Sequence, residues 1–173
     1  MTGLIRYTGY IIKRKNFSEV DKIITVFSKE QGIITLTAKG IRRIKSRRAP
    51  HLELFNLVEI RTHKRTINEA KIIKDYRDHK SDLKTVGYLY YIFETLSKVL
   101  PENVPHPEIF ELTAGFLEGA IDEEGVKSLM IKIVWDLGYL PPGELPKVGV
   151  TTFIESIAER KIHSKRFLEK IVD

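Results

Sequence analysis

The sequence predicts a multi-domain α+β protein in which a small all-β domain over residues 1–80 precedes an α-helical domain over residues 81–173. Short runs of β-branched and aromatic residues fill the first part, whereas apolar residues spaced by three and four fill the second. The charge also changes sign between the two parts. Residues 1–80 hold 19 Lys and Arg against 8 Asp and Glu, and residues 81–173 hold 10 against 15. A basic part joined to an acidic part is expected to meet different partners.

The composition restricts the class of protein. With 42% hydrophobic and 30% charged residues in 173, the chain is globular rather than disordered. The absence of cysteine excludes disulfides and thiolate zinc sites. The longest apolar run, from Tyr88 to Phe93, is too short to span a bilayer, and no secretory signal is visible. We therefore expect a cytoplasmic protein with no membrane partner.

Five strands are predicted in the first part, and turn signals separate them. Gly32 ends the tight turn after the second strand, where its freedom to take a positive φ is needed, and a polar turn from His63 to Asn68 joins the last two. Five short strands in this length suggest a small barrel or sandwich, and the five-stranded barrel that binds oligonucleotides is the OB-fold. The predicted strands cover residues 4–13, 22–28, 33–38, 52–62 and 69–76.

Helices are predicted in the second part. Ser81 and Asp82 can cap a helix that Pro101 stops near residue 100. Pro107 can open a second helix that reaches about residue 121, and Gly138 closes a third. Two short helical patterns follow a connector rich in Pro and Gly. The third helix and these two patterns cover residues 124–137, 151–160 and 164–172.

One stretch carries the strongest functional signal, because it holds six cations and no carboxylate. Cations packed this closely repel one another, and a polyanion lying across them would relieve that repulsion and release its counterions. A solvated basic loop without a partner is the alternative. The six cations are Lys39, Arg42, Arg43, Lys45, Arg47 and Arg48.

Two smaller basic clusters accompany this stretch if the barrel is an OB-fold. Lys13, Arg14 and Lys15 would lie in the loop between the first two strands, and Arg61, Lys64 and Arg65 would lie at the loop between the last two. All three clusters would then surround one side of the barrel.

Binding of single strands also uses aromatic rings on which bases stack. Phe17, in a polar loop, is the candidate ring. Tyr7, Tyr10 and Phe27 fit the barrel core better.

No motif indicates an enzyme. There is no Walker-type phosphate loop and no Gly-x-Gly-x-x-Gly, and the five His residues have no metal-ligand spacing. Glu69-Ala70-Lys71, with Glu59 or Glu53 upstream, can imitate the Glu-x-Lys of a metal-dependent nuclease. The motif is only three residues long and alternating Glu and Lys are common on exposed strand faces, so pairing of surface charges is the favoured explanation. We expect no catalytic residue, no bound metal and no cofactor.

Three segments resemble the amino-terminal domain of the RecO family of bacterial recombination mediators. They are FSEVDKIIT (17–25), GIITLTAKGIRR (32–43) and LELFN (52–56), and WDLGYLP (135–141) resembles the helical domain more weakly. The resemblance implies an OB-fold followed by a helical domain. It also implies binding of single- and double-stranded DNA, annealing of complementary strands, and partnership with RecR and single-stranded-DNA-binding protein to load RecA.

The chain departs from the family pattern in one respect. Many members carry a four-cysteine zinc element after the segment that matches 135–141, and here residues 141–149 stand in its place without cysteine. The family's helical domain also receives the acidic, apolar tail of the single-stranded-DNA-binding protein, which requires an apolar pocket with a basic rim. Lys98, Lys127 and Lys132 are the cations available on the predicted helices.

The leading hypothesis from the sequence is a non-enzymatic DNA repair and recombination mediator associated with the nucleoid. The main alternatives are an adaptor whose basic loop binds an acidic protein, and an RNA-binding protein, because phosphate contacts hardly distinguish the two nucleic acids.

Overall fold

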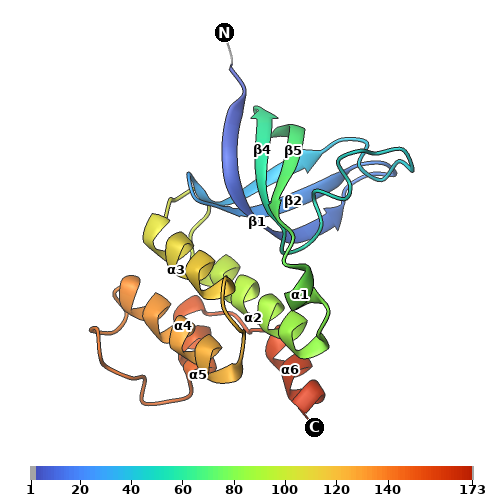
Figure 1. The fold of residues 1–173 in the computed structure, drawn as a ribbon. Helices are drawn as coiled ribbons and strands as arrows, with labels where there is room; N and C mark the ends of the chain where they lie inside the picture. The colour runs from blue at the N-terminus through green and yellow to red at the C-terminus, as the bar shows by residue number, and fades with distance from the viewer. Residues whose placement is uncertain (1–2, 173) are drawn as a thin grey trace. The chain divides into compact units, whose positions relative to one another are not determined.

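The computed structural model describes residues 3–172 and divides them into two compact units. The barrel unit runs to Tyr76 and also includes Pro101–His106. The helical unit comprises Arg77–Leu100 and the chain from Pro107 onward. All strands of the described chain lie in the barrel unit and all its helices in the helical unit (Figure 1). The predicted α+β class is confirmed.

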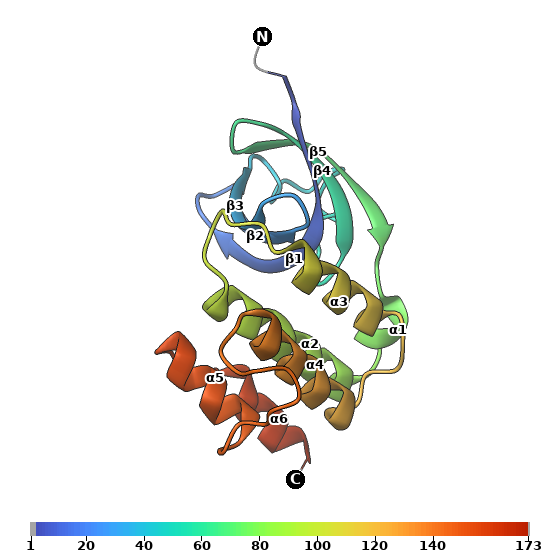
Figure 2. The ribbon, with the colours of Figure 1, turned by 90° about the vertical axis from the view of Figure 1, so that its left-hand side faces the viewer.

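Five strands form a closed barrel in the order β1-β2-β3-β5-β4 (Figure 2). All neighbours are antiparallel except β3 and β5, which pair in parallel where Thr37 meets Thr66. Closure removes the exposed strand edges that would otherwise favour aggregation. The predicted OB-fold is therefore confirmed. The strands are β1 (Ile5–Asn16), β2 (Lys22–Ser28), β3 (Gly32–Ala38), β4 (Leu57–His63) and β5 (Thr66–Lys74).

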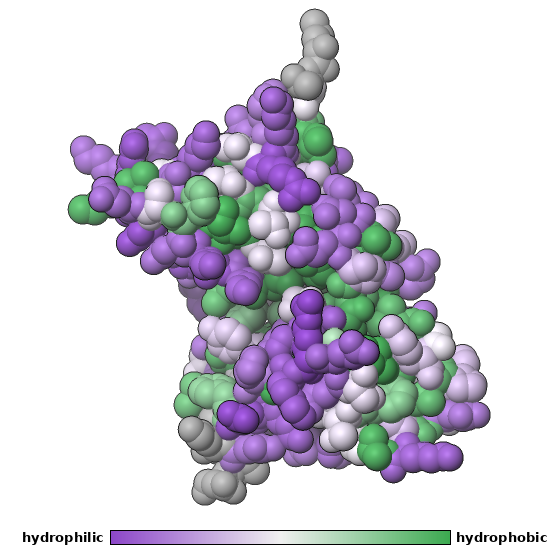
Figure 3. All heavy atoms as spheres, turned by 180° about the vertical axis from the view of Figure 1, so that it is seen from behind, coloured by the Kyte–Doolittle hydropathy of each residue, from purple (hydrophilic) through white to green (hydrophobic). Residues whose placement is uncertain are grey.

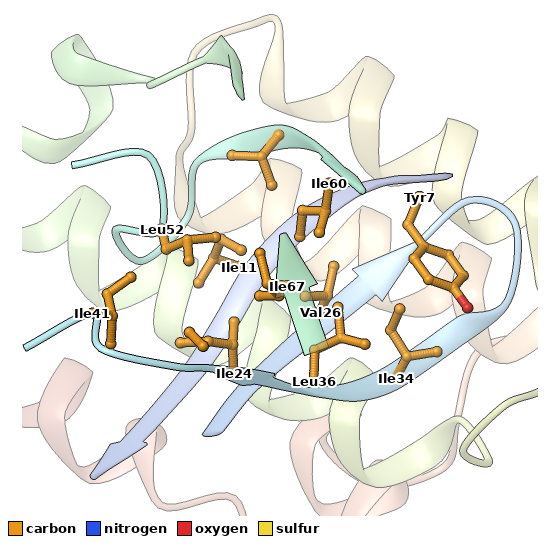
Figure 4. Close-up of a cluster of buried hydrophobic side chains, with 12 residues drawn as sticks. Tyr7, Ile11, Ile24, Val26, Ile34, Leu36, Ile41, Leu52, Ile60 and Ile67 are labelled. Carbon is orange, nitrogen blue, oxygen red and sulfur yellow. The ribbon is translucent and has the colours of Figure 1, made fainter. Parts of the chain in front are cut away.

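The barrel interior is filled by alternate residues of the strands, as the period of a strand requires. In β2, for example, Ile24 and Val26 are fully buried. Figure 4 shows these side chains converging from several strands. Each fully buried aliphatic side chain contributes about 1.5–3 kcal/mol to stability. The cluster comprises Tyr7, Ile11, Ile24, Val26, Ile34, Leu36, Ala38, Ile41, Leu52, Val58, Ile60 and Ile67.

The first strand is longer than predicted. Its register shifts between Ile11 and Lys13, and the pairing with β2 then continues to Asn16, opposite Lys22. This irregularity is a β-bulge, which bends the strand and lets it follow the barrel wall further. The loop between β1 and β2 is therefore only residues 17–21.

The fourth and fifth strands also differ from the prediction. Residues 52–56 form turns rather than strand, and Phe55 has a φ of 67°. Leu52 and Phe55 are nevertheless buried, so their apolar character reflects packing of a turn and not a strand face. The fifth strand begins earlier than expected, at Thr66, because Lys64 takes a φ of 53° and closes a tight turn.

Residues 101–106 return to the barrel unit after the first long helix. The Asn103 N–H donates to the Ile33 carbonyl at 2.8 Å, and Ile33 forms a parallel bridge with Glu102. Gly32 makes this approach possible, because a Cβ on it would lie 2.0 Å from the Val104 carbonyl oxygen. Gly32 also has a φ of 68°, as the predicted turn requires.

The helical unit is built on two capped helices. The Asp82 carboxylate accepts a hydrogen bond from the Thr85 N–H at 2.8 Å, and that of Asp122 accepts one from the Gly125 N–H at 2.7 Å. Both caps begin helices whose apolar stripes are buried. The helices are α1 (Arg77–Lys80), α2 (Leu83–Val99), α3 (Pro107–Leu117), α4 (Glu123–Asp136), α5 (Val150–Ala158) and α6 (Ser164–Val172).

One predicted helix end differs from the structure, one helix was not predicted, and one predicted end agrees. The second predicted helix ends at Leu117 rather than near residue 121, and α1 was not predicted. Gly138, with a φ of 78°, follows the end of α4 as expected. No helix in the described part of the chain is long and apolar enough to cross a membrane.

The last helix is fastened to α2 by one carboxylate. Glu94 accepts hydrogen bonds from the backbone N–H groups of His163 and Ser164, both at 2.8 Å, at the beginning of α6. The same side chain pairs with Lys98 at 2.6 Å. Gly87 lets the helices approach closely, because a Cβ there would lie 2.7 Å from Leu168 Cδ2.

Candidate nucleic-acid interface

The basic stretch from Lys39 to Arg48, called here the basic loop, begins the connection between β3 and β4. Its backbone follows a series of turns, in which the Arg43 N–H donates to the Gly40 carbonyl at 3.2 Å. It projects from the barrel unit on the same side as the loop between β1 and β2 (Figure 1). Seen from behind, this end of the unit carries mostly hydrophilic side chains with a few hydrophobic ones among them (Figure 3).

The basic loop is fixed to the β1–β2 loop by three hydrogen bonds. The Gly40 N–H donates to the Asp21 carboxylate at 2.7 Å, and the Arg42 N–H donates to the Val20 carbonyl at 3.0 Å. The Arg42 guanidinium also donates to the Ser18 carbonyl at 2.6 Å. These bonds hold the two loops together, so that their side chains form one surface.

Arg48 stabilises the conformation of the basic loop. Its guanidinium donates to the Ile67 carbonyl at 2.6 Å and to the Lys39 carbonyl at 2.5 Å. Two hydrogen bonds to backbone oxygen use donors that a phosphate would otherwise need. Arg48 therefore closes the basic loop against β5, and fewer of its donors remain open to a ligand.

The other four cations of the basic loop are exposed and directed to no carboxylate. In the part of the chain that the structure describes, Lys39, Arg43, Lys45 and Arg47 form no ion pair. Their mutual repulsion is relieved only by solvent and counterions. This is the charge arrangement that a nucleic-acid backbone neutralises with release of counterions.

The prediction that Lys13, Arg14 and Lys15 lie in a loop is wrong, because all three belong to β1. Successive side chains of a strand point to opposite faces. Lys13 and Lys15 are exposed, whereas Arg14 is partly buried and pairs with Glu53 at 2.6 Å. Arg14 also donates to the Leu52 carbonyl at 3.2 Å, so it ties β1 to the turn that follows the basic loop.

Lys64 and Arg65 occupy the turn between β4 and β5, and both are exposed. The Thr37 N–H donates to the Arg65 carbonyl at 2.8 Å, which places this turn beside the end of β3 from which the basic loop departs. Arg61 lies within β4 and not in the turn. Hydrogen bonds at the barrel wall thus connect the three segments that carry the predicted cations.

The aromatic candidates separate as expected. Phe17 is 67% exposed in the β1–β2 loop, whereas Tyr7, Tyr10 and Phe27 are buried. Ile44, which was not predicted from the sequence, is fully exposed among the cations of the basic loop. An isolated aliphatic residue inside a charge run was the signal that could have found it. Two apolar side chains therefore accompany the cations on two loops that are bonded together.

The carboxylates named for the nuclease alternative are not arranged as a metal site. Glu59 and Glu69 lie on neighbouring strands, but both contact Arg61, at 3.7 and 3.4 Å respectively. A guanidinium between two carboxylates occupies the place a divalent ion would need. Within residues 3–172, no group of three or more His, Cys, Asp and Glu side chains is placed to hold a metal ion.

Of the three cations predicted on the helices, two are paired with carboxylates and one is exposed without an ion pair in the described chain. Lys98 is held by Glu94 and by the Lys161 carbonyl, and Lys127 pairs with Glu123 at 3.1 Å. Hydrogen bonds from Lys127 to Glu123 and Glu124 raise the pKa of its ammonium. Lys132 is exposed, and within the described chain it has no ion pair.

A cavity of about 690 Å³ lies in the helical unit, bounded by α2, α4, α5 and α6. Tyr88, Val126 and Leu168 give it an apolar lining. Lys127 and Lys165 stand beside Glu123 and Glu169 at its edge, with Lys165 3.9 Å from Glu169. The beginning of α5 also lines it, and Gly149 gives that helix no side-chain cap.

Comparison with known proteins assigns both units to one family. Residues 1–80 match the family model described as Recombination protein O N terminal, and residues 80–142 match the one described as Recombination protein O C terminal.

Curated relatives point to the same family. The chain is 29% identical to DNA repair protein RecO of Acetivibrio thermocellus over 159 aligned residues. The aligned region covers 86% of this chain and 63% of that protein. It is 27% identical over 148 residues to the protein of that name from Symbiobacterium thermophilum, covering 80% and 58%. It is 30% identical over 146 residues to DNA repair protein RecO of Desulfitobacterium hafniense, and the aligned region covers 80% of this chain and 54% of that protein.

The chain thus spans about six tenths of the length of these relatives. The two family models nevertheless meet at residue 80 and together cover residues 1–142. The chain belongs to the RecO family.

Proposed function

We propose that this chain is a DNA-binding mediator of repair and recombination that holds single- and double-stranded DNA on the surface formed by the basic loop and the β1–β2 loop. One observation carries the proposal: Lys39, Arg43, Lys45 and Arg47 are exposed and have no carboxylate partner in the described chain. Their charge attracts the phosphate backbone without reading sequence. Lys13, Lys15, Lys64 and Arg65 extend the same positive field.

Annealing of complementary strands follows from this surface. Two strands repel each other through their phosphates, and a dense group of cations that contacts both lowers that repulsion. Phe17 and Ile44 add apolar contacts to unpaired bases, for which stacking on a ring is worth about 1–3 kcal/mol per base. Such contacts favour open single strands over duplex and leave the bases exchangeable.

The test compares two double reversals of equal charge. Arg43→Glu with Arg47→Glu removes two unpaired loop cations without touching the bonds of Arg42 or Arg48. Lys71→Glu with Lys132→Glu changes the net charge equally at exposed positions outside the proposed surface. Binding to a single-stranded oligonucleotide is measured by fluorescence anisotropy over a salt series.

We expect the loop variant to bind much more weakly and to lose about 0.7 from the slope of log K against log salt for each phosphate contact removed. The control variant should keep the wild-type slope. A flat salt dependence in the wild-type protein would refute the phosphate role. Strand annealing, followed with a quenched complementary pair, should fail in the same variant that fails to bind.

The alternatives predict other outcomes of the same assay. An adaptor for acidic proteins would bind heparin or an acidic protein as well as DNA and would not accelerate annealing. An RNA-binding protein would prefer RNA of the same sequence and length, because recognition of the 2′-hydroxyl distinguishes the two polymers.

We further propose that the helical unit receives protein partners. The apolar cavity beside α5 suits a short acidic and apolar segment such as the tail of single-stranded-DNA-binding protein. The uncapped first N–H groups of α5 are available to a carboxylate there. Together with RecR, such a contact would bring the chain to coated single strands and so assist loading of RecA. A labelled tail peptide should bind the wild-type chain and be released when Val126→Glu places a carboxylate in the apolar lining.

A further inference from the structure

A second cavity, of about 320 Å³, lies in the barrel unit where β1, β2 and the β3–β4 connection meet. It is called here the anion pocket. Its volume is about ten times the share of one water molecule in the liquid, so a small polar group and its water fit inside. The lining residues that matter for its chemistry are Arg14, Asn16, Lys22, Arg42 and Glu53.

The charges around the anion pocket do not balance. Three cations face a single carboxylate, and that carboxylate, Glu53, is already paired with Arg14 at 2.6 Å. Lys22 and Arg42 have no ion pair in the described part of the chain. The pocket therefore holds two positive charges in excess, on side chains whose backbones are fixed by strand pairing and by the loop bonds.

The surroundings of Lys22 show the cost of this arrangement. Partial burial, and after it the Arg14 guanidinium, lower the pKa of its ammonium, Glu53 offsets part of this, and Arg42 lowers the pKa further. A group that is destabilised by its neighbours in this way gains when an anion enters. Sequence reasoning missed Lys22, because a lysine at the start of a strand gives no signal of its own.

Resting on the proposed DNA binding, we propose that the anion pocket binds the terminal phosphate of a nucleic-acid strand, with Lys22, Arg42 and Arg14 as its ligands. A phosphodiester within a strand carries one negative charge, whereas a phosphomonoester carries about −1.5 to −2 at neutral pH. The excess of two positive charges matches the terminal group better. Arg42 would then join the pocket to the exposed cations of the basic loop, along which the rest of the strand lies.

The experiment uses four single-stranded oligonucleotides of one sequence, with a 5′-phosphate, a 3′-phosphate, both, or hydroxyl ends only. Affinities are measured by competition against a labelled hydroxyl-ended strand. The wild-type chain should bind one phosphorylated end about tenfold or more tightly than the hydroxyl-ended strand, the effect of one hydrogen bond between charged groups. Inorganic phosphate should reduce this preference at a lower concentration than it needs to displace hydroxyl-ended DNA.

Two variants of Lys22 separate charge from structure. Lys22→Met, which keeps the volume of the side chain, should abolish the preference for a phosphorylated end and leave hydroxyl-ended DNA bound within about twofold. Lys22→Arg should restore the preference. Lys71→Met removes a cation from an exposed position on β5 and should leave both affinities unchanged.

The result distinguishes this inference from the proposed function. If phosphorylated and hydroxyl-ended strands bind equally well to the wild-type chain, the inference is overturned while DNA binding stands. If no strand binds, DNA binding is refuted, and a ³¹P NMR titration with inorganic phosphate then decides the pocket. If the phosphate signal broadens with the wild-type chain and not with Lys22→Met, the pocket binds anions. If neither the wild-type chain nor Lys22→Met changes the phosphate signal, the inference is overturned.

Discussion

The carboxylate of Glu94 offers the sharpest test of how the helical unit is held together. It accepts hydrogen bonds from Lys98 at 2.6 Å and from the N–H groups of His163 and Ser164 at 2.8 Å. Two of these donors belong to the beginning of α6, where negative charge is favourable. Glu94→Gln keeps the shape but replaces one carboxylate oxygen with an NH₂ group that faces donors. We therefore expect the attachment of α6 to α2 to weaken.

The size of the effect follows from the acidity of the group. Partial burial raises the pKa of Glu94, but the hydrogen bonds from Lys98, Ser164 and His163 outweigh it and lower the pKa from 4.5 to about 2. A change of one pKa unit is worth about 1.4 kcal/mol, which gives about 3 kcal/mol at most. Because solvent reaches part of the carboxylate, we expect Glu94→Gln to lower the free energy of unfolding by about 1–2 kcal/mol at neutral pH.

The lowered pKa of Glu94 also determines how stability depends on pH. A carboxyl whose pKa is lower in the folded state stabilises the fold above its unfolded value and loses that contribution as pH falls. The difference between wild type and Glu94→Gln should therefore be full above about pH 4.5 and should shrink as pH falls towards 2. Urea unfolding followed by the fluorescence of Trp135, the single tryptophan of the chain, reports on the helical unit.

Glu108→Gln is the matched control, because Glu108 is exposed on α3 and has no ion pair within residues 3–172. It should change the free energy of unfolding by less than about 0.5 kcal/mol. Equal stability of Glu94→Gln and wild type at pH 7, or a difference between them that does not change between pH 7 and 3, would refute the attachment of α6 through this carboxylate.

Two further predictions concern the barrel unit. Gly32→Ala should lower the free energy of unfolding by about 2–4 kcal/mol in urea unfolding followed by circular dichroism, because it adds strain at a positive φ and a clash with the Val104 carbonyl. Gly119→Ala, which meets nothing closer than 3.8 Å, is its control, and equal stabilities would contradict the close approach. Phe17→Ala with Ile44→Ala should weaken single-stranded DNA binding by about tenfold or more at unchanged salt slope. Tyr139→Ala, an exposed ring in the helical unit, should leave it unchanged, and a reduced slope in the double variant would show that the loops had moved.

How much the sequence predicts depends on whether the responsible contacts are local. The runs of β-branched residues, the Asp82 cap and the turn at Gly32 act within a few residues, and each predicted its element correctly. The turn around Phe55 was wrongly predicted as strand, because its apolar residues pack on the barrel from an irregular backbone. A bulge likewise extended β1, so that Arg14 and Lys15 lie in the strand and not in the predicted loop.

By itself, then, the sequence determined the fold class, the exposed charge of the basic loop and the separation of Phe17 from the core aromatics, because burial pattern and net charge are properties of short segments. Only the tertiary structure decided which cations remain open to a ligand. Arg48 donates to Ile67, 19 residues away, and Arg14 donates to Leu52, 38 residues away. Such bonds depend on which strands become neighbours in the closed barrel. The same neighbourhood brings Lys22 beside Arg42 and forms the anion pocket, which no local pattern encodes.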